Sequence, residues 1–287
     1  MFKHITAFFY IFFMLELEQQ SEITERCMDM LIGYESFKEK IFKLTDIDLS
    51  CYKERQMKRR IDSLITRNGF KDYDSYYNSL LKDNRLYNEF INYLTINVSE
   101  FFRNPSQWEI LEKEIIPQLL SIKKNIKIWS AACSTGEEPY SLVMLLSKFM
   151  RLNEIKILAT DIDEDAINKA KIGVYSEKSI ANVPVEFINK YFNKMSNSYK
   201  IREEIKKCVE FKKHNLLMDK YPSGCDLISC RNVLIYFTED AKNNIYLKFS
   251  KALSPYGVLF VGSTEQIISA HKYNLQPMKN FFYRLKE

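Results

Sequence analysis

The sixteen residues IKIWSAACSTGEEPYS, at positions 126–141, decide the fold of this chain. The apolar residues up to Trp129 predict a buried strand, the small residues 131–136 predict a tight turn, and residues 137–148 predict a helix. Two glutamates and a proline stand in the first helical turn, where unpaired N–H groups and a fixed φ suit them. A strand, a small-residue loop and a helix are typical of an open α/β sheet, which binds ligands at the carboxyl ends of its strands.

A second segment of the same kind is IKILATDID, at positions 155–163. Asp161 ends its strand about 25 residues after Gly136, near the spacing at which a dinucleotide fold presents an acid to ribose hydroxyls. The first loop lacks the full G-x-G-x-x-G pattern, and Glu137 and Glu138 would repel a pyrophosphate. The two segments therefore favour a nucleoside ligand without phosphates, such as S-adenosylmethionine with its cationic sulfonium.

Composition and length indicate a globular protein of two domains. The chain has 287 residues, of which 46% are hydrophobic and 28% charged, and its net charge is +5; these values exclude a disordered chain. Its six cysteines include no C-x-x-C pair, which favours reduced thiols over a disulfide framework or a zinc site.

The N-terminal residues 1–30 are predicted to be an extension, either disordered or translated from an upstream start codon. Residues 5–15 form an apolar run that is shorter than the roughly 20 residues needed to span a bilayer. The polar sequence that follows holds no small-residue cleavage site, so a packed helix or a mis-assigned start is favoured over a secretion signal.

Residues 31–96 are predicted to form a small all-α domain, in which Gly69 ends a helix. One helix carries cations around the apolar residues Met57, Ile61 and Leu64, and its charged side is expected to be a solvated basic ridge. The ridge comprises Lys53, Arg55, Lys58, Arg59 and Arg60.

Residues 97–287 are predicted to form an α/β domain. Between positions 174 and 210 the strand–helix alternation lapses into a pattern typical of short antiparallel strands, which indicates an insertion. A buried strand starts at Cys225, a helix starts at Thr238, and the tail FFYRL is predicted to be a last, antiparallel strand.

With these motifs in view, the chain resembles the chemotaxis receptor methyltransferases, the CheR family of protein-glutamate O-methyltransferases, from about Tyr34 to Leu285. The motifs that carry the resemblance are more specific together than any one alone. They are NVSEFFR at 97–103, SAACSTGEEPYS at 130–141, DID at 161–163, NLL at 215–217 and CRNVLIYF at 230–237.

The resemblance implies a Rossmann-like methyltransferase domain with an inserted β-subdomain, preceded by a helical domain. It implies S-adenosylmethionine as methyl donor, S-adenosylhomocysteine as product and no metal. The implied acceptors are glutamates on the signalling helices of methyl-accepting chemotaxis receptors. The resemblance also implies a cytoplasmic monomer that lies beside receptor arrays at the inner membrane face. It implies neither insertion into the membrane nor binding of nucleic acid. The residues that it places around the cofactor are Asn97, Ser99, Arg103, Glu138, Asp161, Asn215, Leu216, Arg231 and Asn232.

For the reaction itself the resemblance suggests Arg103 and Tyr236. A glutamate with a pKa of about 4.3 is ionised at neutral pH, so the acceptor needs positioning rather than a strong base. Arg103 could hold either the acceptor carboxylate or that of the cofactor, and Tyr236, at a strand's end, could donate a hydrogen bond to the acceptor. The basic ridge is expected to steer acidic receptor helices to the enzyme.

One stretch departs from the family pattern. Members that dock on a C-terminal receptor pentapeptide have a glycine-containing loop in the β-subdomain, whereas residues 193–202 contain no glycine. This difference argues against tether docking and favours direct recognition of the methylation helices.

Plainer interpretations remain open for each of these features. Asp161 could cap a helix, the asparagines could satisfy turns, Tyr236 could be a core aromatic, and the basic ridge could be only a solvated face. Two rival functions are a nucleic-acid methyltransferase and a cofactor-binding scaffold without activity. Pro-Pro and Pro-Cys, typical of base methyltransferases, are both absent from the sequence, and the presence of Arg103, Asp161 and Tyr236 argues against the scaffold.

Overall fold

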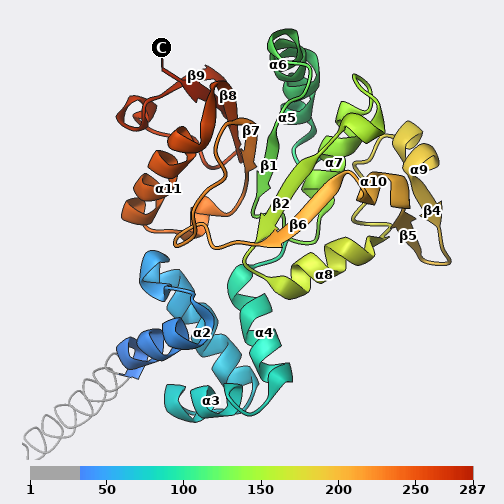
Figure 1. Cartoon of the computed structure of the whole chain (residues 1–287). Coiled ribbons are helices and arrows are strands. Elements are labelled where there is room, and N and C mark those ends of the chain that lie inside the picture. Colours follow the sequence, from blue (N-terminus) through green and yellow to red (C-terminus); the bar gives the residue numbers. More distant parts are fainter. Residues whose placement is uncertain (1–32, 287) are drawn as a thin grey trace, which may run out of the picture. The chain divides into compact units, whose positions relative to one another are not determined.

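The computed structural model describes residues 33–286, which form two compact units (Figure 1). One unit contains the described residues up to Ser50 together with Glu54–Tyr87, and the other contains Cys51–Lys53 and the chain from Asn88 onward. The predicted N-terminal extension, residues 1–30, lies outside the described residues. None of the helices in the described part of the chain is long and apolar enough to cross a membrane.

The first unit is helical, as the sequence predicted. Residues 33–45 are helical, and they are followed by the 3₁₀ turn η1 (Leu49–Cys51) and the helices α2 (Glu54–Arg67), α3 (Tyr73–Leu80) and α4 (Asn84–Thr95), the last of which continues into the second unit. Gly69 adopts a left-handed φ of 80° after α2, and the Asp72 carboxylate caps α3 by accepting from Ser75 N at 2.7 Å. Met57, Ile61 and Leu64 face the core from α2.

The second unit is built on a seven-stranded mixed sheet with the order β6-β2-β1-β7-β8-β10-β9. The first five strands are parallel, and β10 pairs antiparallel with β8 and with β9. The strands are β1 (Ile128–Ala131), β2 (Ile157–Asp161), β6 (Val209–Lys213), β7 (Cys225–Cys230), β8 (Leu253–Val261), β9 (Leu275–Lys279) and β10 (Phe282–Leu285). The strand order reverses between β1 and β7, where an open sheet offers its ligand crevice.

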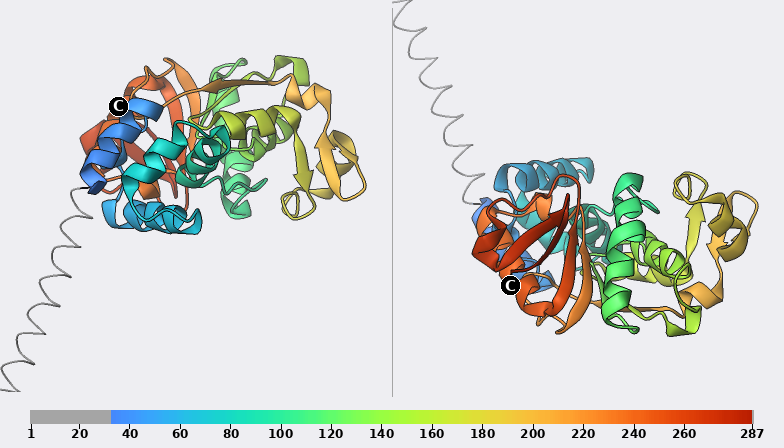
Figure 2. Two further views of the ribbon diagram at one scale, coloured as in Figure 1. Left: turned by 90° about the horizontal axis from the view of Figure 1, so that it is seen from below. Right: turned by 90° about the horizontal axis from the view of Figure 1, so that it is seen from above.

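Helices cover both faces of this sheet because strand side chains alternate between the faces. Ile128 packs with the helices α5, η2, α6 and α7, whereas its neighbour Trp129 packs with α11 on the opposite face, and Figure 2 shows these helices on opposite sides of the strands. The bounds are α5 (Pro105–Ile110), the π-helical η2 (Leu111–Ile115), α6 (Ile116–Ile122), α7 (Glu137–Leu146), α8 (Glu164–Ile172) and α11 (Glu239–Ala252), with the 3₁₀ turns η3 (Leu152–Glu154), η4 (Leu234–Tyr236) and η5 (Ala270–Tyr273).

A separate three-stranded antiparallel sheet with the order β3-β5-β4 is inserted between α8 and β6. Its strands are β3 (Val174–Ser176), β4 (Phe192–Lys194) and β5 (Ser198–Ile201). Helix α9 (Val185–Tyr191) lies between β3 and β4, and helix α10 (Glu203–Lys206) lies between β5 and β6. The predicted antiparallel strands are present, but the prediction is wrong for the residues that form α9, because Phe187 and Tyr191, one helical turn apart, are both buried. Val209 and Glu210 belong to β6 of the main sheet.

Candidate functional site

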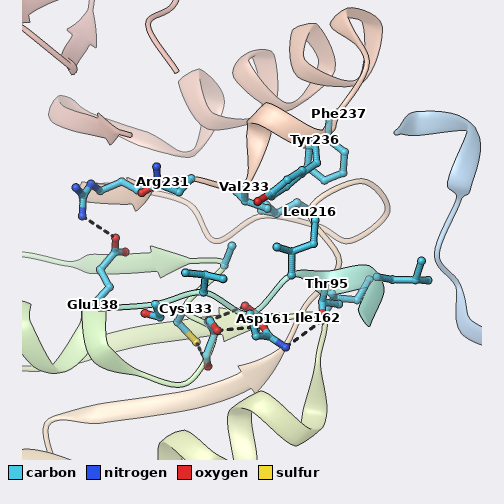
Figure 3. Close-up of a pocket in the computed structure, with 18 of the residues that line it drawn as sticks. Thr95, Cys133, Glu138, Asp161, Ile162, Leu216, Arg231, Val233, Tyr236 and Phe237 are labelled. Carbon is cyan, nitrogen blue, oxygen red and sulfur yellow. Dashed lines mark hydrogen bonds and ion pairs between the residues drawn. The ribbon is translucent and has the colours of Figure 1, made fainter. Parts of the chain in front are cut away.

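A pocket of about 960 Å³, including the open space at its mouth, lies at the carboxyl ends of β1, β2 and β7 (Figure 3). Its lining comes entirely from the second unit. The structure brings together at this pocket all the residues predicted to bind the cofactor or take part in the reaction. They are Asn97, Ser99, Arg103, Glu138, Asp161, Asn215, Leu216, Arg231, Asn232 and Tyr236.

The loop between β1 and α7 is shaped by left-handed backbone. Ala132, Ser134 and Gly136 have φ values of 66°, 48° and 93°. A Cβ on Gly136 would lie 2.8 Å from the Cβ of Ala170, so only glycine fits between this loop and α8. The tight turn points the N–H of Ser134 at the neighbouring strand end, where it donates to the Asp161 carboxylate at 2.7 Å.

Asp161 is the last residue of β2 and is 7% exposed. One carboxylate oxygen accepts from Ser134 N, and the other accepts from Asp163 N at 3.0 Å. Burial raises the pKa of Asp161 to about 6, although both N–H groups favour the ionised form. The side chain therefore presents an oriented hydrogen-bond acceptor at the wall of the pocket.

Asn97 is held at both ends of its side-chain amide by protein groups. Its Nδ2 donates to Asp163 Oδ2 at 2.6 Å, and its Oδ1 accepts from Ser134 Oγ at 3.0 Å. The other oxygen of Asp163 caps α8 by accepting from Asp165 N and Ala166 N. Asn97 thus ties three segments together, and Asp163, to which the sequence interpretation assigned no role, is the centre of the network. Its position as N-cap before a helical run was the available signal.

The two glutamates that begin α7 are buried, at 4% and 9% exposure, rather than solvated first-turn residues. Glu138 accepts from Ser130 Oγ at 2.8 Å and lies 3.6 Å from the Arg231 guanidinium. Glu137 accepts from Thr135 Oγ1 at 2.7 Å, and burial raises its pKa. Glu138 therefore gives the pocket a second carboxylate besides that of Asp161.

Arg231 is 7% exposed, with its guanidinium carbon 4.5 Å from the ring centroid of Phe260. Its Nη2 donates to Gln107 Oε1 and to the backbone oxygen of Arg103, both at 2.7 Å. Arg103 itself is half-buried, and its Nη1 donates to Val98 O at 3.1 Å. The buried Arg231 therefore fixes the backbone of the more exposed Arg103.

Tyr236 lies in the 3₁₀ turn η4 and not at the end of a strand as predicted, because β7 ends at Cys230 and the chain then turns through Asn232, whose φ is 60°. The backbone oxygen of Tyr236 accepts from Lys53 N at 2.9 Å. The Tyr52 ring packs 4.8 Å from that of Phe237, and both residues line the pocket. No pattern in the sequence indicated Tyr52, which reaches the pocket through its β-bridge to Phe237.

Asn215 and Leu216 lie in the loop that follows β6. Asn215 Oδ1 accepts from Leu217 N at 2.9 Å, which is the turn-forming role left open from the sequence, while Leu216 is 8% exposed and adds an apolar wall. His214 packs its ring against Trp129, and burial lowers its pKa, so it is neutral near pH 7.

The basic ridge divides between the two units. Lys53 is exposed in the second unit, whereas Arg55, Lys58, Arg59 and Arg60 belong to α2 in the first. Lys58 is turned inward, with its ammonium 3.0 Å from Asp62 and its side chain 19% exposed, while Arg55 and Arg59 are exposed. The solvated cations on α2 are therefore fewer than the sequence pattern suggested.

The lining of the pocket fits S-adenosylmethionine. Asp161 offers an acceptor for ribose hydroxyls, Glu138 adds a second carboxylate, which is paired with Arg231, and Leu216, Val233 and Phe237 provide apolar surface for a base. Among the described residues the lining has no run of glycine N–H groups of the kind that cradles a pyrophosphate.

Comparisons with known proteins agree with this fit. Residues 97–282 match the model of the CheR methyltransferase, SAM binding domain, and residues 32–95 match the CheR methyltransferase, all-alpha domain. A chemotaxis protein methyltransferase of Listeria innocua is 43% identical over 83% of this chain and 91% of its own. Those of Borreliella burgdorferi and Escherichia coli are 39% and 31% identical, covering 77% and 85% of this chain and 83% and 87% of their own. The family match, its span and the convergence of its motifs on one pocket together show that this chain belongs to the CheR methyltransferase family and takes S-adenosylmethionine as its cofactor.

Proposed function

We propose that this protein methylates glutamate side chains of chemotaxis receptors, giving glutamate methyl esters. The observation that carries the proposal is that Arg103 and Tyr236 line the same pocket as the buried carboxylates Glu138 and Asp161. Such a pocket can hold a sulfonium nucleoside on its carboxylate side and a second, anionic reactant near Arg103. The names of the relatives as chemotaxis protein methyltransferases support the choice of acceptor.

Bound S-adenosylmethionine supplies an electrophilic methyl group on its sulfonium and leaves as S-adenosylhomocysteine. Asp161 would accept hydrogen bonds from the ribose, and its orientation is set by Ser134 N and Asp163 N. Ser99, Asn215, Leu216 and Asn232 complete the cofactor wall. Asn97 and Arg231 act mainly by holding the loops in place, because the Asn97 amide and the Nη2 of Arg231 bond to protein partners.

The acceptor glutamate is ionised at neutral pH and needs no general base. Arg103 donates one of its five guanidinium N–H groups to Val98 O, so the others can orient a carboxylate. The Tyr236 hydroxyl then donates to the acceptor oxygen that does not attack. Alignment of this kind contributes about 7–11 kcal/mol when both reactants are held in line. An Arg103→Lys enzyme with near-normal turnover would count against this role.

Receptor docking is proposed to be direct. The hairpin of β4 and β5 turns through residues 195–197, a short loop without glycine. We expect receptor fragments with and without their C-terminal tail to be methylated at equal rates. A large loss of kcat/KM on removal of the tail would instead indicate tether docking.

The activity is tested with tritiated S-adenosylmethionine, a receptor cytoplasmic fragment and, separately, DNA. We expect label on the receptor that is released by mild alkali, as an ester is, and mass spectrometry should place the methyl group on glutamate. Alkali-stable label, label on DNA, or no transfer would each contradict the proposal.

A further inference from the structure

Glu265 is a buried carboxylate that no sequence motif singled out. It follows β8 in the chain and is 5% exposed. Its Oε2 accepts from Asn232 N at 2.6 Å and Gly262 N at 2.9 Å, and its Oε1 accepts from Leu234 N at 2.7 Å and Ile235 N at 3.2 Å. One carboxylate thus receives four backbone N–H groups.

Three of these four donors belong to the loop between β7 and α11, which forms one wall of the pocket. Asn232, Val233, Tyr236 and Phe237 all line the pocket. The loop begins with the left-handed Asn232, so its first N–H groups leave the sheet and have no strand partner. Buried N–H groups left without an acceptor destabilise the fold, and Glu265 supplies the acceptors. The side chain therefore determines the path of this loop.

The two loops approach so closely that Gly262 is required. A Cβ at this position would lie 2.5 Å from Glu265 Oε2 and 2.9 Å from Asn232 N. No φ in the left-handed region is involved here, so the constraint is space alone. An alanine would have to push the carboxylate away from its donors.

We propose that Glu265 is a positioning residue for the methyl transfer, which holds Asn232 toward the cofactor and Tyr236 toward the acceptor through the backbone of the loop. Glu265 is not among the residues that line the pocket, so it acts through the loop. The inference about Tyr236 rests on the proposed function, whereas the inference about Asn232 rests only on cofactor binding.

The test compares Glu265→Gln with Asp226→Asn. The amide oxygen of glutamine can accept from one pair of N–H groups, but its NH₂ group faces the other pair. Asp226 is a matched control because it is also a buried carboxylate, 6% exposed, that accepts from a backbone N–H group, Lys127 N, at 2.7 Å. It lies near the start of β7, whereas the pocket loop follows the end of that strand. Both variants should unfold at lower urea concentrations than the wild type.

Only Glu265→Gln should weaken binding of S-adenosylhomocysteine by tenfold or more in calorimetry, and it should lower kcat on the receptor fragment at saturating cofactor. Gly262→Ala, which keeps the carboxylate but displaces it, should show the same pattern if Glu265→Gln fails to fold. Binding and kcat of Glu265→Gln within twofold of the wild type would overturn the proposal, as would an equal loss of binding in Asp226→Asn. If the wild type does not methylate the receptor, the proposed acceptor is wrong, and the calorimetry still decides the role of Glu265.

Discussion

The side chain of Arg231 donates a hydrogen bond of 2.7 Å to the backbone oxygen of Arg103, a residue 128 positions earlier in the chain. The same guanidinium contacts Gln107 Oε1 and approaches Glu138. Two of the family motifs, NVSEFFR and CRNVLIYF, are therefore joined by one buried cation. Because the Nη2 group of Arg231 bonds to the segment that carries Arg103 and to Gln107, its main effect on the cofactor is to fix that segment.

Replacing this cation tests that interpretation. In Arg231→Lys the charge is retained, but a single ammonium cannot reach Arg103 O, Gln107 and Glu138 in the planar arrangement of a guanidinium. We expect a loss of about 2 kcal/mol in the free energy of unfolding, measured by urea denaturation, together with weaker binding of S-adenosylhomocysteine. Arg151→Lys is the control, since Arg151 is 82% exposed and pairs only with nearby Glu154; an equal loss in both variants would contradict the scaffold role.

The buried carboxyl of Asp161 predicts a pH dependence of cofactor binding. Only the ionised form is an acceptor for both ribose hydroxyls, and burial raises its pKa to about 6. Affinity for S-adenosylhomocysteine should therefore be constant above pH 7 and fall about tenfold per pH unit well below pH 6. Calorimetry between pH 5 and 8 measures this, and Asp161→Asn should bind weakly with no such dependence.

The same carboxyl predicts the opposite trend for the stability of the free protein. Between about pH 4 and 6 the folded protein binds more protons than the unfolded chain, so the free energy of unfolding falls as the pH rises through this range. A pKa of about 6 in place of 3.8 corresponds to roughly 3 kcal/mol in full. Urea denaturation should show the free energy of unfolding of the wild type falling, relative to that of Asp161→Asn, as the pH rises across this range. Parallel curves would show that the carboxyl titrates normally.

Removing the hydroxyl of Tyr236 should separate chemistry from binding. We expect Tyr236→Phe to lower kcat about 10- to 100-fold, the cost of one lost hydrogen bond in the transition state. Its affinity for S-adenosylhomocysteine should stay within about twofold of the wild type, since the ring can still pack. Phe237→Leu, at the neighbouring pocket residue, is the control for packing alone. Unchanged turnover in Tyr236→Phe would remove the hydroxyl from the mechanism.

The parts of the fold that depend on local pattern were predictable from the sequence. The apolar runs at Ile128 and Ile157 gave parallel strands, and the acidic and small residues after them gave the pocket, because strand ends in a parallel sheet share one edge. The helical domain and the inserted antiparallel strands followed from their periodicity, and the structure confirms both.

The contacts that complete the site could not be predicted, because each joins residues far apart in the chain. Glu265 is an ordinary glutamate in sequence and becomes an anchor only when four N–H groups surround it. Tyr52 reaches the pocket through a bridge to Phe237, and β9 pairs at a sheet edge where its alternation is weak. Helix α9 was mistaken for strand because Phe187 and Tyr191 are embedded in a mixed apolar pattern that suits either period.

The exposed cations of α2 predict how receptor methylation responds to salt. Arg55 and Arg59 are exposed, whereas Lys58 is held by Asp62, so the first two should carry most of the attraction for acidic receptor helices. The double variant Arg55→Glu, Arg59→Glu should lower kcat/KM for a receptor fragment about tenfold at low salt, with kcat little changed. Salt screens exposed charges that lie more than a Debye length apart, a length of about 10 Å at 0.1 M that shortens as salt is added. The difference from the wild type should therefore shrink as salt is raised toward 0.5 M.

Arg85→Glu supplies the control for this experiment, because Arg85 is 87% exposed on α4. This substitution changes the net charge by the same amount as each of the two substitutions on α2. If attraction of the receptor depended only on net charge, the position of an Arg→Glu change would not matter. The single variant would then lower log(kcat/KM) by about half as much as the double variant does. We expect Arg85→Glu to leave kcat/KM within about twofold of the wild type at every salt concentration. A salt-independent rate in the wild type would mean that neither the exposed arginines nor the net charge steers the receptor.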